Sequence, residues 1–318
     1  MKKIKYNIIM LFLMMVVNAA TNFAEAKDEY RYCTECRSYK RLNEFPKGGG
    51  SVCNVCKNAK NKKNKSSKEK NNKTKGNDGV SQKTCKCGRP IPPGKGTICE
   101  TCKAENEAKA RKMSIINDYV SDMVFVQSGS FMMGGKTVEV ASFYIAKTEV
   151  TQDLWEAVMG YNPSVNIGNK LPVENVTWDE CKAFIRELNG LQNMDYRLPS
   201  EAEWEFAARG GNKSQEKNYS GADVAAEVAW YMDNSEGTTH EVGTKLANEL
   251  GLYDMSGNVW EWCENSWYSY HDISSVDTTR RVCRGGSWNM ANDYCNIDQR
   301  TPFEHNERKS NIGLRLVR

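Results

Sequence analysis

Strand-like alternation of apolar and polar residues begins after residue 122. Residues 123–135 alternate in this way and end in two glycines, which predicts a strand entering a hairpin, and residues 138–150 supply a partner of the same kind. After Gly211 the chain is rich in glycine and keeps no sustained period. These patterns predict an α+β domain with much ordered loop, whose backbone groups need partners other than regular ladders.

Helices are predicted where apolar residues recur every three or four positions. The spacing predicts helices over 104–119 and over 152–159, the second capped by Thr151. Two more helices begin with capping boxes, at Thr177–Glu180 and Ser200–Glu203, in which a hydroxyl and a carboxylate accept backbone N–H groups at the helix start. We interpret these acids as caps rather than catalysts.

The two parts of the chain differ sharply in charge. Residues 27–112 carry 23 Lys and Arg against 9 Asp and Glu, whereas residues 113–318 carry 18 against 30. All 8 tryptophans lie in the second part, so only that part is expected to build a large hydrophobic core. The first part must be stabilised in another way.

The N-terminus has the features of a secretory signal peptide. Three early lysines precede an apolar run from Ile8 to Val17, and Ala24-Glu25-Ala26 matches an A-x-A cleavage site. The run is too short to span a bilayer. The sequence therefore predicts that residues 1–26 are cleaved and that the protein is secreted or periplasmic, and its Lys- and Asn-rich usage indicates a bacterial source.

A first set of cysteines lies in residues 27–58. Cys33-x2-Cys36 and Cys53-x2-Cys56 are separated by sixteen residues, a spacing typical of a zinc ribbon, because two thiolate pairs on facing turns complete a tetrahedral site. The stretch is similar to the small zinc ribbons that accompany some nucleases. It predicts a zinc-ribbon-like module.

A second set lies in residues 84–103. Cys85-x-Cys87 and Cys99-x2-Cys102 repeat the scheme with one tighter pair, so they predict a second zinc module with four cysteine ligands. For both sets the alternative is disulfide bonding, because an exported chain with an even number of cysteines commonly forms disulfides. Either way the cysteines replace a hydrophobic core.

Residues 59–83 form a run rich in Lys and Asn that has too few apolar residues to fold, and we predict a disordered linker. Its positive charge could attract an anionic surface polymer by counterion release. It has no interleaved aromatic residues for stacking on bases, and export argues against nucleic acid as a partner. Residues 104–122 are then predicted as a helical linker into the next domain.

The stretch Gly251–Trp262 combines a glycine turn with two acids and two tryptophans. Its oxygen-bearing positions are spaced i, i+3, i+5 and i+7, and an oxygen-only set suits Ca²⁺. The alternative is a glycine turn whose tryptophans fill a core. The four positions are Asp254, Gly257, Val259 and Glu261.

Four motifs together resemble one known family. Gly251–Trp262, Tyr196–Gly211, Arg281–Trp288 and Asn311–Arg318 are similar, in content and order, to the formylglycine-generating enzyme (sulfatase-modifying factor) family over residues 123–318. The resemblance implies a C-type-lectin-like α+β fold. It also implies a calcium site at the four positions named above, formed by two carboxylates and two backbone carbonyls.

The family's enzymes oxidise a sulfatase cysteine to formylglycine with molecular oxygen, and two cysteines after the Gly-Gly-Ser motif hold Cu⁺. By the resemblance, Cys295 stands at the second of these positions, but the first is Met290. A thioether is a soft but neutral ligand, so it binds copper more weakly than a thiolate. The resemblance further implies that Ser287 lines the pocket, with Trp260 a looser candidate.

The chemistry of Cys295 has several interpretations. It is a nucleophile, a structural thiol, or a disulfide partner of Cys181, Cys263 or Cys283. Another branch of the fold uses a three-histidine iron site, which is not favoured here because the three histidines are far apart in the sequence and lack that branch's spacing.

Residues Asn289–Lys309 are dense in Asn, Asp, Arg, Tyr and Phe, which make adaptable contacts on loops held by a rigid scaffold. In lectin-like relatives of the fold the same region is a variable ligand-binding face. The sequence therefore predicts a non-catalytic or altered family member that binds a protein or peptide ligand. The alternative is an oxygen-dependent oxidoreductase acting on a sulfatase.

Overall fold

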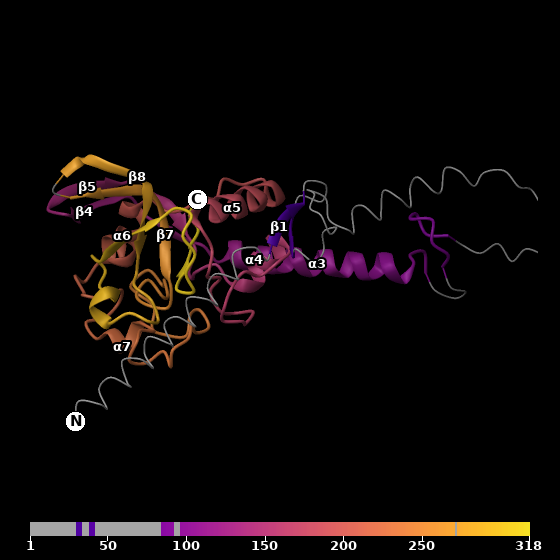
Figure 1. The fold of residues 1–318 in the computed structure, drawn as a ribbon. Coiled ribbons are helices and arrows are strands. Elements are labelled where there is room, and N and C mark those ends of the chain that lie inside the picture. The colour runs from indigo at the N-terminus through magenta and orange to yellow at the C-terminus, as the bar shows by residue number, and fades with distance from the viewer. Residues whose placement is uncertain (1–29, 34–37, 42–83, 92–95, 271) are drawn as a thin grey trace, which may run out of the picture. The chain divides into compact units, whose positions relative to one another are not determined.

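The chain divides into two compact units, residues 1–80 and 81–318. The structure, a computed structural model shown in Figure 1, describes residues 30–33, 38–41, 84–91, 96–270 and 272–318. In the first unit, β1 (Tyr30–Cys33) pairs antiparallel with β2 (Ser38–Arg41). The predicted signal peptide and Lys-rich linker lie outside the described residues.

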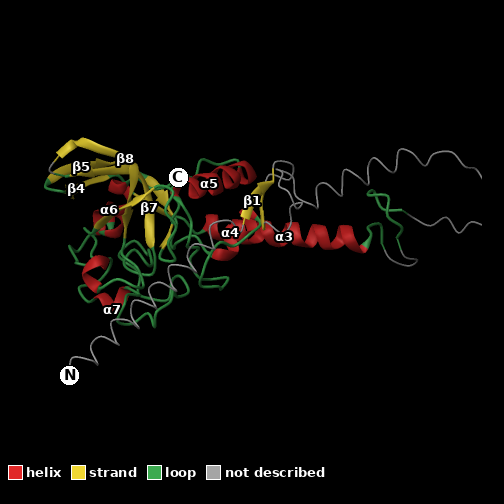
Figure 2. Cartoon of the chain, viewed as in Figure 1, coloured by secondary structure: helices red, strands yellow, loops and turns green. Residues whose placement is uncertain are grey.

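The second unit contains a long helix, α3 (Glu100–Ser121), drawn at the centre of Figure 2. It confirms the helix predicted over 104–119 and extends it at both ends. Only Ile116 is buried within it, and the helix packs against α4 (Gln152–Met159). Among the described residues, no helix is both long enough and apolar enough to cross a bilayer.

Two short antiparallel pairs follow α3. β3 (Val124–Val126) pairs with β6 (Phe143–Ile145), and β4 (Gly129–Met133) pairs with β5 (Lys136–Val140). The turn between β4 and β5 consists of two glycines with positive φ, a conformation that other residues rarely adopt. The hairpin predicted from the alternating pattern is therefore confirmed.

The predicted helix starts are confirmed in position, although Thr151, the N-cap residue of α4, makes no side-chain capping bond. Both capping boxes form: Thr177 opens α5 (Trp178–Gln192) and Ser200 opens α6 (Glu201–Ala208). In each box the hydroxyl accepts the backbone N–H three residues on, and the Glu at that position accepts the N–H of the cap. These glutamates therefore act as helix caps. A shorter helix, α7 (Ala225–Val228), lies in the glycine-rich part of the chain.

The largest sheet among the described residues has the strand order β10-β7-β8-β9. It consists of β7 (Trp260–Ser269), β8 (Asp272–Arg284), β9 (Arg300–Glu304) and β10 (Ile312–Gly313), with β10 parallel to β7 and the other pairs antiparallel. The expectation of an irregular chain after Gly211 is wrong here. Polar residues hide the strand pattern, and shifts in the β7–β8 register interrupt it further.

The C-terminal residues pair with two segments from earlier in the domain. The N–H groups of Tyr144, Ala146 and Val150 donate to carbonyls of residues 318, 316 and 314. Val317 also exchanges backbone hydrogen bonds with Arg197. The last residues thus close the domain against the segment that follows β5.

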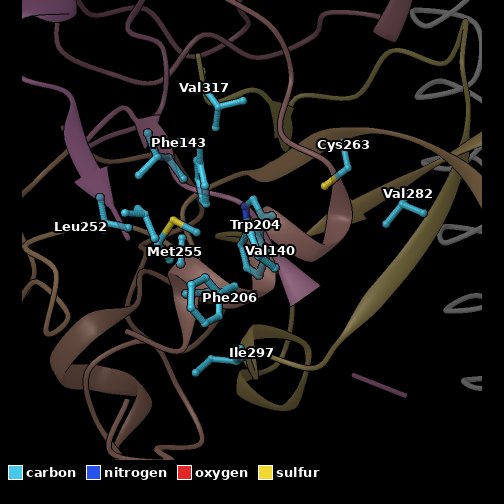
Figure 3. Close-up of a cluster of buried hydrophobic side chains, with 14 residues drawn as sticks. Val140, Phe143, Trp204, Phe206, Leu252, Met255, Cys263, Val282, Ile297 and Val317 are labelled. Atoms are coloured by element: carbon cyan, nitrogen blue, oxygen red, sulfur yellow. The ribbon is translucent and has the colours of Figure 1, made fainter. Parts of the chain in front are cut away.

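The main hydrophobic core lies between α6 and the strands around it (Figure 3). Trp204 and Phe206 of α6 are buried beside Val140, Leu252 and Met255. Large aromatic side chains bury the most apolar area per residue, so they contribute much of the burial free energy. A second contact stacks Trp155 of α4 on Phe184 of α5, with ring centroids 4.8 Å apart.

Because Phe184 is fully buried against Trp155, Phe184→Ala is expected to lower the free energy of unfolding by about 3–5 kcal/mol. Leu191→Ala, at an exposed position of the same helix, is the control and should cost less than about 1 kcal/mol. Urea unfolding followed by tryptophan fluorescence measures both. Equal losses in the two variants would show that the stack does not join α4 to α5.

Candidate functional site

The Gly-Gly-Ser motif forms the turn that follows β8. Gly285 and Gly286 have φ of 98° and 76°, in the left-handed region that favours glycine. A Cβ on Gly286 would lie 2.7 Å from the Sγ of Cys295 and 2.7 Å from the carbonyl oxygen of Tyr294. The turn therefore packs directly against Cys295, which ends the short 3-10 turn η4 (Asn292–Cys295).

Cys295 is fully buried, with 0% of its surface exposed. Burial raises the pKa of its thiol to about 12, although the backbone N–H of Ser287 partly stabilises the thiolate. A thiol of this kind is protonated at neutral pH, and the thiolate is the form that attacks substrates and binds metals. It packs in a small cluster with Tyr219, Ala222, Ala225, Val228 and Ala229.

The side chains of the other residues expected at the active site do not converge on this thiol, although the backbone N–H of Ser287 contacts it. Met290 is half-buried and is not among the side chains that pack around Cys295. Ser287 is buried, donates to Asn289 and accepts from Asn311. Trp260 packs edge-on to Phe303 in the core, with ring centroids 6.3 Å apart.

Copper does not fit the arrangement around Cys295. Cu⁺ requires soft, preferably anionic ligands, and the thiol here is buried, protonated and surrounded by apolar side chains. We therefore derive no copper chemistry from Cys295 and Met290. The structure gives Cys295 a packing role beneath the glycine turn.

The remaining cysteines of this domain are buried and unbonded. Cys181, Cys263 and Cys283 have 0% exposure and form no disulfide in the structure. Burial is the largest cause that raises the pKa of each thiol well above its usual value. They behave as small apolar side chains.

The described histidines do not form a metal site. His240 stacks on Trp230 with ring centroids 3.7 Å apart, and the Nδ1 of His305 lies 2.7 Å from the carboxylate of Asp179. The third histidine, at position 271, lies outside the described residues. Within the part of the chain that the structure describes, His, Cys, Asp and Glu side chains form one group with metal-binding geometry, and it contains no histidine.

The carboxylate expected to bind calcium is already occupied by protein donors. Arg315 donates to both oxygens of Glu261 at 2.7–3.0 Å, and the indole N–H of Trp204 donates to Oε2 at 2.7 Å. Asp254 accepts the backbone N–H of Gly243 at 2.7 Å. Both Glu261 oxygens thus accept protein N–H groups, three in all, and the calcium prediction for Asp254, Gly257, Val259 and Glu261 stays a prediction.

An acidic cluster surrounds this ion pair. Glu149, Asp254 and Glu261 are all buried, and Arg315, the basic group of the cluster, is bonded to Glu261. Burial, together with the neighbouring carboxylates, raises the pKa of Glu149 well above its usual value. Burial also raises the pKa of Asp254 to about 6. Both acids therefore hold their protons to a higher pH than ordinary carboxyl groups.

The second cysteine set does converge. The sulfur atoms of Cys85, Cys87, Cys99 and Cys102 all lie within 4.8 Å of one another. The sulfurs of Cys87 and Cys99 are 3.5 Å apart, and the N–H of Cys102 points to the Cys99 sulfur at 3.5 Å. The group could therefore hold a metal ion, as the spacing predicted.

Most of the first cysteine set lies outside the described residues. Cys33 ends β1, where its backbone pairs with Ser38 of β2. The first C-x2-C motif thus begins at the end of one strand of a hairpin. The zinc prediction for Cys33, Cys36, Cys53 and Cys56 stays a prediction.

The segment Asn289–Lys309 exposes side chains around two buried anchors. Cys295 and Ile297 are 0% and 2% exposed, whereas Tyr294 is 45% exposed. At its start, the carbonyl of Met290 accepts the N–H of Met232 at 2.9 Å. The sequence left the role of Cys295 open and did not identify Ile297, because isolated apolar residues carry no period.

A cavity of about 430 Å³ lies between the C-terminal half of α3 and the domain. Tyr119 lines it and donates to the carbonyl of Thr148 at 3.0 Å, while Lys147 pairs with Asp122 at 2.6 Å. No sequence pattern indicates this cavity, since its lining comes from segments far apart in the chain. The lining residues also include Ile115, Asp118, Thr151, Asp153, Lys170, Val242, Gly243 and Tyr253.

Gly286→Ala is expected to destabilise the domain more than Gly160→Ala. Both glycines have positive φ, at 76° and 79°, but only at Gly286 would a Cβ meet neighbouring atoms. We expect a loss of roughly 1–2 kcal/mol for Gly160→Ala from backbone strain, and roughly 1–3 kcal/mol more for Gly286→Ala from overpacking. Equal losses in urea unfolding would contradict the packing role of Cys295.

Asp254→Asn tests the acidic cluster. Folded Asp254 keeps its proton up to about pH 6, whereas its ordinary pKa is 3.8, so its ionisation lowers stability as pH rises through this window. We expect the stability of Asp254→Asn relative to wild type to increase by on the order of 1–3 kcal/mol between about pH 4 and 7. Urea unfolding across this range measures it.

The wild type and Asp254→Asn also test whether the domain binds calcium. Added Ca²⁺ and added chelator should leave the wild-type unfolding midpoint unchanged, because both Glu261 oxygens already accept protein N–H groups. A midpoint that rises with Ca²⁺ in the wild type, and not in Asp254→Asn, would establish the calcium site and contradict this arrangement.

A known protein family, individual relatives and solved structures are similar to large parts of this chain. Residues 109–318 match the family model described as the sulfatase-modifying factor enzyme 1-like domain. The chain is 34% identical over 252 residues to the chaperone protein LppX of Paenibacillus barcinonensis, covering 62% of this chain and 89% of that protein. Among solved structures, Treponema denticola variable protein 1 aligns with a TM-score of 0.56 and 33% identity, covering 61% of this chain and 94% of that one.

Relatives with and without enzymatic activity are both similar to this chain. The formylglycine-generating enzyme of Streptomyces coelicolor is 29% identical over 188 residues, covering 51% of this chain and 57% of the enzyme. The inactive C-alpha-formylglycine-generating enzyme 2 of Bos taurus is 29% identical over 183 residues, covering 53% and 57%. The family model spans more than half of the chain, so this protein belongs to the sulfatase-modifying factor enzyme 1-like family.

Proposed function

We propose that this protein is a non-catalytic member of its family that binds a protein or peptide ligand through the segment Asn289–Lys309. The observation that carries the proposal is the position of Cys295. The thiol that would perform the family's chemistry is a buried anchor for an exposed segment. A catalytic thiol must instead be reachable and readily ionised.

Both ends of the segment are held by the scaffold. Ser235 donates to the carbonyl of Trp288 at 2.8 Å near its start, and the N–H of Asn175 donates to the carbonyl of Lys309 at its end. Arg308 forms an ion pair with Glu180 of α5. Exposed residues between fixed ends can change without disturbing the core, which is what an adaptable contact surface requires.

The chemistry of the exposed face suits a polypeptide ligand. Tyr294 and Met232 are 45% and 57% exposed and flank the start of the segment. The segment also carries exposed polar and charged residues, including Asn289, Asp293 and Asp298. Large apolar side chains inside a polar rim are typical of protein-binding surfaces.

The names of two of the compared proteins support a non-catalytic function. One family relative is named as an inactive enzyme, so the fold persists without the reaction. One solved structure of the same fold is named as a variable protein. Function depends on the site rather than on the fold, and the site here differs from a thiolate pair.

The reaction of the family gives the first test. The full chain is incubated with Cu⁺, oxygen and a peptide that carries a Cys-x-Pro-x-Arg motif, and the peptide mass is measured. We expect no conversion of the peptide cysteine to an aldehyde, because Cys295 is buried and Met290 cannot replace a thiolate. A sulfatase peptide that binds without conversion would agree with the proposal and identify a ligand class.

Aldehyde that forms with the wild type and disappears in Cys295→Ala would contradict the proposal and establish the alternative, an oxygen-dependent oxidoreductase acting on a sulfatase. Cys181→Ala is the matched control, since its thiol is equally buried but follows no Gly-Gly-Ser motif.

A second test addresses binding. Peptides selected from a random displayed library on the wild-type chain should bind the double variant Met232→Ser/Tyr294→Ala about tenfold or more weakly, as loss of a central apolar contact requires. Val276→Ser, an exposed apolar position on β8, is the control and should bind as wild type. Equal binding by all three proteins would place the contact surface elsewhere.

We also propose that the protein is exported and that its Lys-rich linker contacts an anionic surface polymer. The N-terminal sequence motifs and the charge of residues 59–83 support this. Mature protein should begin at Lys27, and retention on an anionic polymer should fall steeply with added salt. A retained N-terminal Met, or retention unaffected by salt, would contradict it.

A further inference from the structure

We propose that the four cysteines at residues 85–102 bind a single Zn²⁺, and that this ion stabilises the solvent-exposed N-terminal half of α3. The resulting metal-capped helix would be a rigid segment that precedes the strands and helices of residues 123–318. The proposal rests on the geometry of the sulfur atoms and on the exposure of the helix.

The sulfur separations match a tetrahedral zinc site. Four sulfurs at about 2.3 Å from one Zn²⁺ are about 3.8 Å from one another. In the structure Cys87 and Cys99 are 3.5 Å apart, and no pair among the four exceeds 4.8 Å. Sulfurs at 3.5 Å are not bonded to each other, and all four cysteines are free. Thiolates without oxygen or imidazole ligands favour Zn²⁺ over harder cations.

The backbone around the cysteines is shaped for such a site. The N–H of Gly88 donates to the carbonyl of Cys85 at 2.8 Å, and the N–H of Cys85 donates to the carbonyl of Arg89 at 2.9 Å. These bonds close a tight turn that carries Cys85 and Cys87. Beneath it, Cys85 and Cys99 are buried with Ile91, which is too little apolar area to fold a separate piece.

The first half of the helix that follows is exposed, and its surface ion pairs, Arg89–Glu105 and Lys103–Glu107, contribute little to stability. From Glu100 to Arg111 no residue is buried, and Ile116 is the buried residue of the whole helix. The contacts to the domain come later, at Asn117, Tyr119 and Asp122. A helical stretch of this length is marginal in water without tertiary contacts.

The cysteine site acts on the first turn of this helix. Cys99 is the N-cap residue, and its sulfur accepts the N–H of Cys102. A metal ion on both sulfurs would fix the helix start and join it to the turn at Cys85 and Cys87. Metal binding would then supply the ordering free energy that side-chain packing does not.

The experiment uses the full chain loaded with zinc. Bound zinc is measured by mass spectrometry of the metal, and hydrogen exchange is followed in peptides that cover residues 100–112. In Cys87→Ser/Cys102→Ser we expect loss of a single zinc ion and about tenfold or more faster exchange in these peptides. Peptides from α5 and β8 should exchange as in the wild type, because those elements are packed in the core. A chelator should reproduce the effect in the wild type.

Cys36→Ser, in the other cysteine set, is the matched control and should leave exchange over residues 100–112 unchanged. Two results would overturn the proposal. One is a protein in which these four cysteines are all in disulfides and no zinc is bound to them. The other is zinc that is lost from the double variant, or removed by the chelator, without any change in exchange over residues 100–112.

Discussion

The domain depends on one buried ion pair, between Arg315 in the C-terminal segment and Glu261 on β7. Neither side chain is exposed, and Arg315 also donates to the carbonyls of Ala146 and Tyr253. The guanidinium of Arg315 therefore joins β7 to Ala146, just after β6, and to Tyr253, in the loop that precedes β7. Removing one partner of such a pair leaves an uncompensated buried charge, which costs about 3–5 kcal/mol. The same donors contact both oxygens of Glu261, the carboxylate that is predicted to bind calcium.

Much of the fold could be predicted from local patterns in the sequence. The capping boxes at Thr177 and Ser200 and the hairpin turn at Gly134-Gly135 formed as predicted, since each depends on residues close together in the chain. The single strand expected over residues 123–135 is instead two strands, β3 and β4, with different partners. The β7–β8 hairpin was missed. Its strands carry acids and arginines whose partners lie far away in the sequence, such as Glu205 and Glu201 for Arg284. Periodicity cannot reveal a strand whose polar residues are satisfied by tertiary contacts.

The candidate site, like the fold, could be predicted only where it depends on residues close together in the sequence. The family resemblance placed Met290 at one of two positions where a thiol is expected, and the cysteine spacing identified four cysteines that do converge. It left open whether Cys295 is reactive or structural. That choice depends on the cluster around Tyr219 and Ala225 and on the turn at Gly286, which meet only in the folded domain. The environment of a thiol, rather than its motif, sets its pKa and hence its reactivity.

We propose that the thiol at the family's reactive position, Cys295, serves packing instead of chemistry. Timed alkylation of the native chain, with each cysteine followed by peptide mass spectrometry from about pH 7 to 10, tests it most directly. The account predicts that Cys295 is modified only as fast as the domain unfolds, because its thiol is buried and its pKa is about 12. Modification of Cys295 in the folded protein, at the rate of an exposed thiolate and with a midpoint near neutral pH, would contradict it.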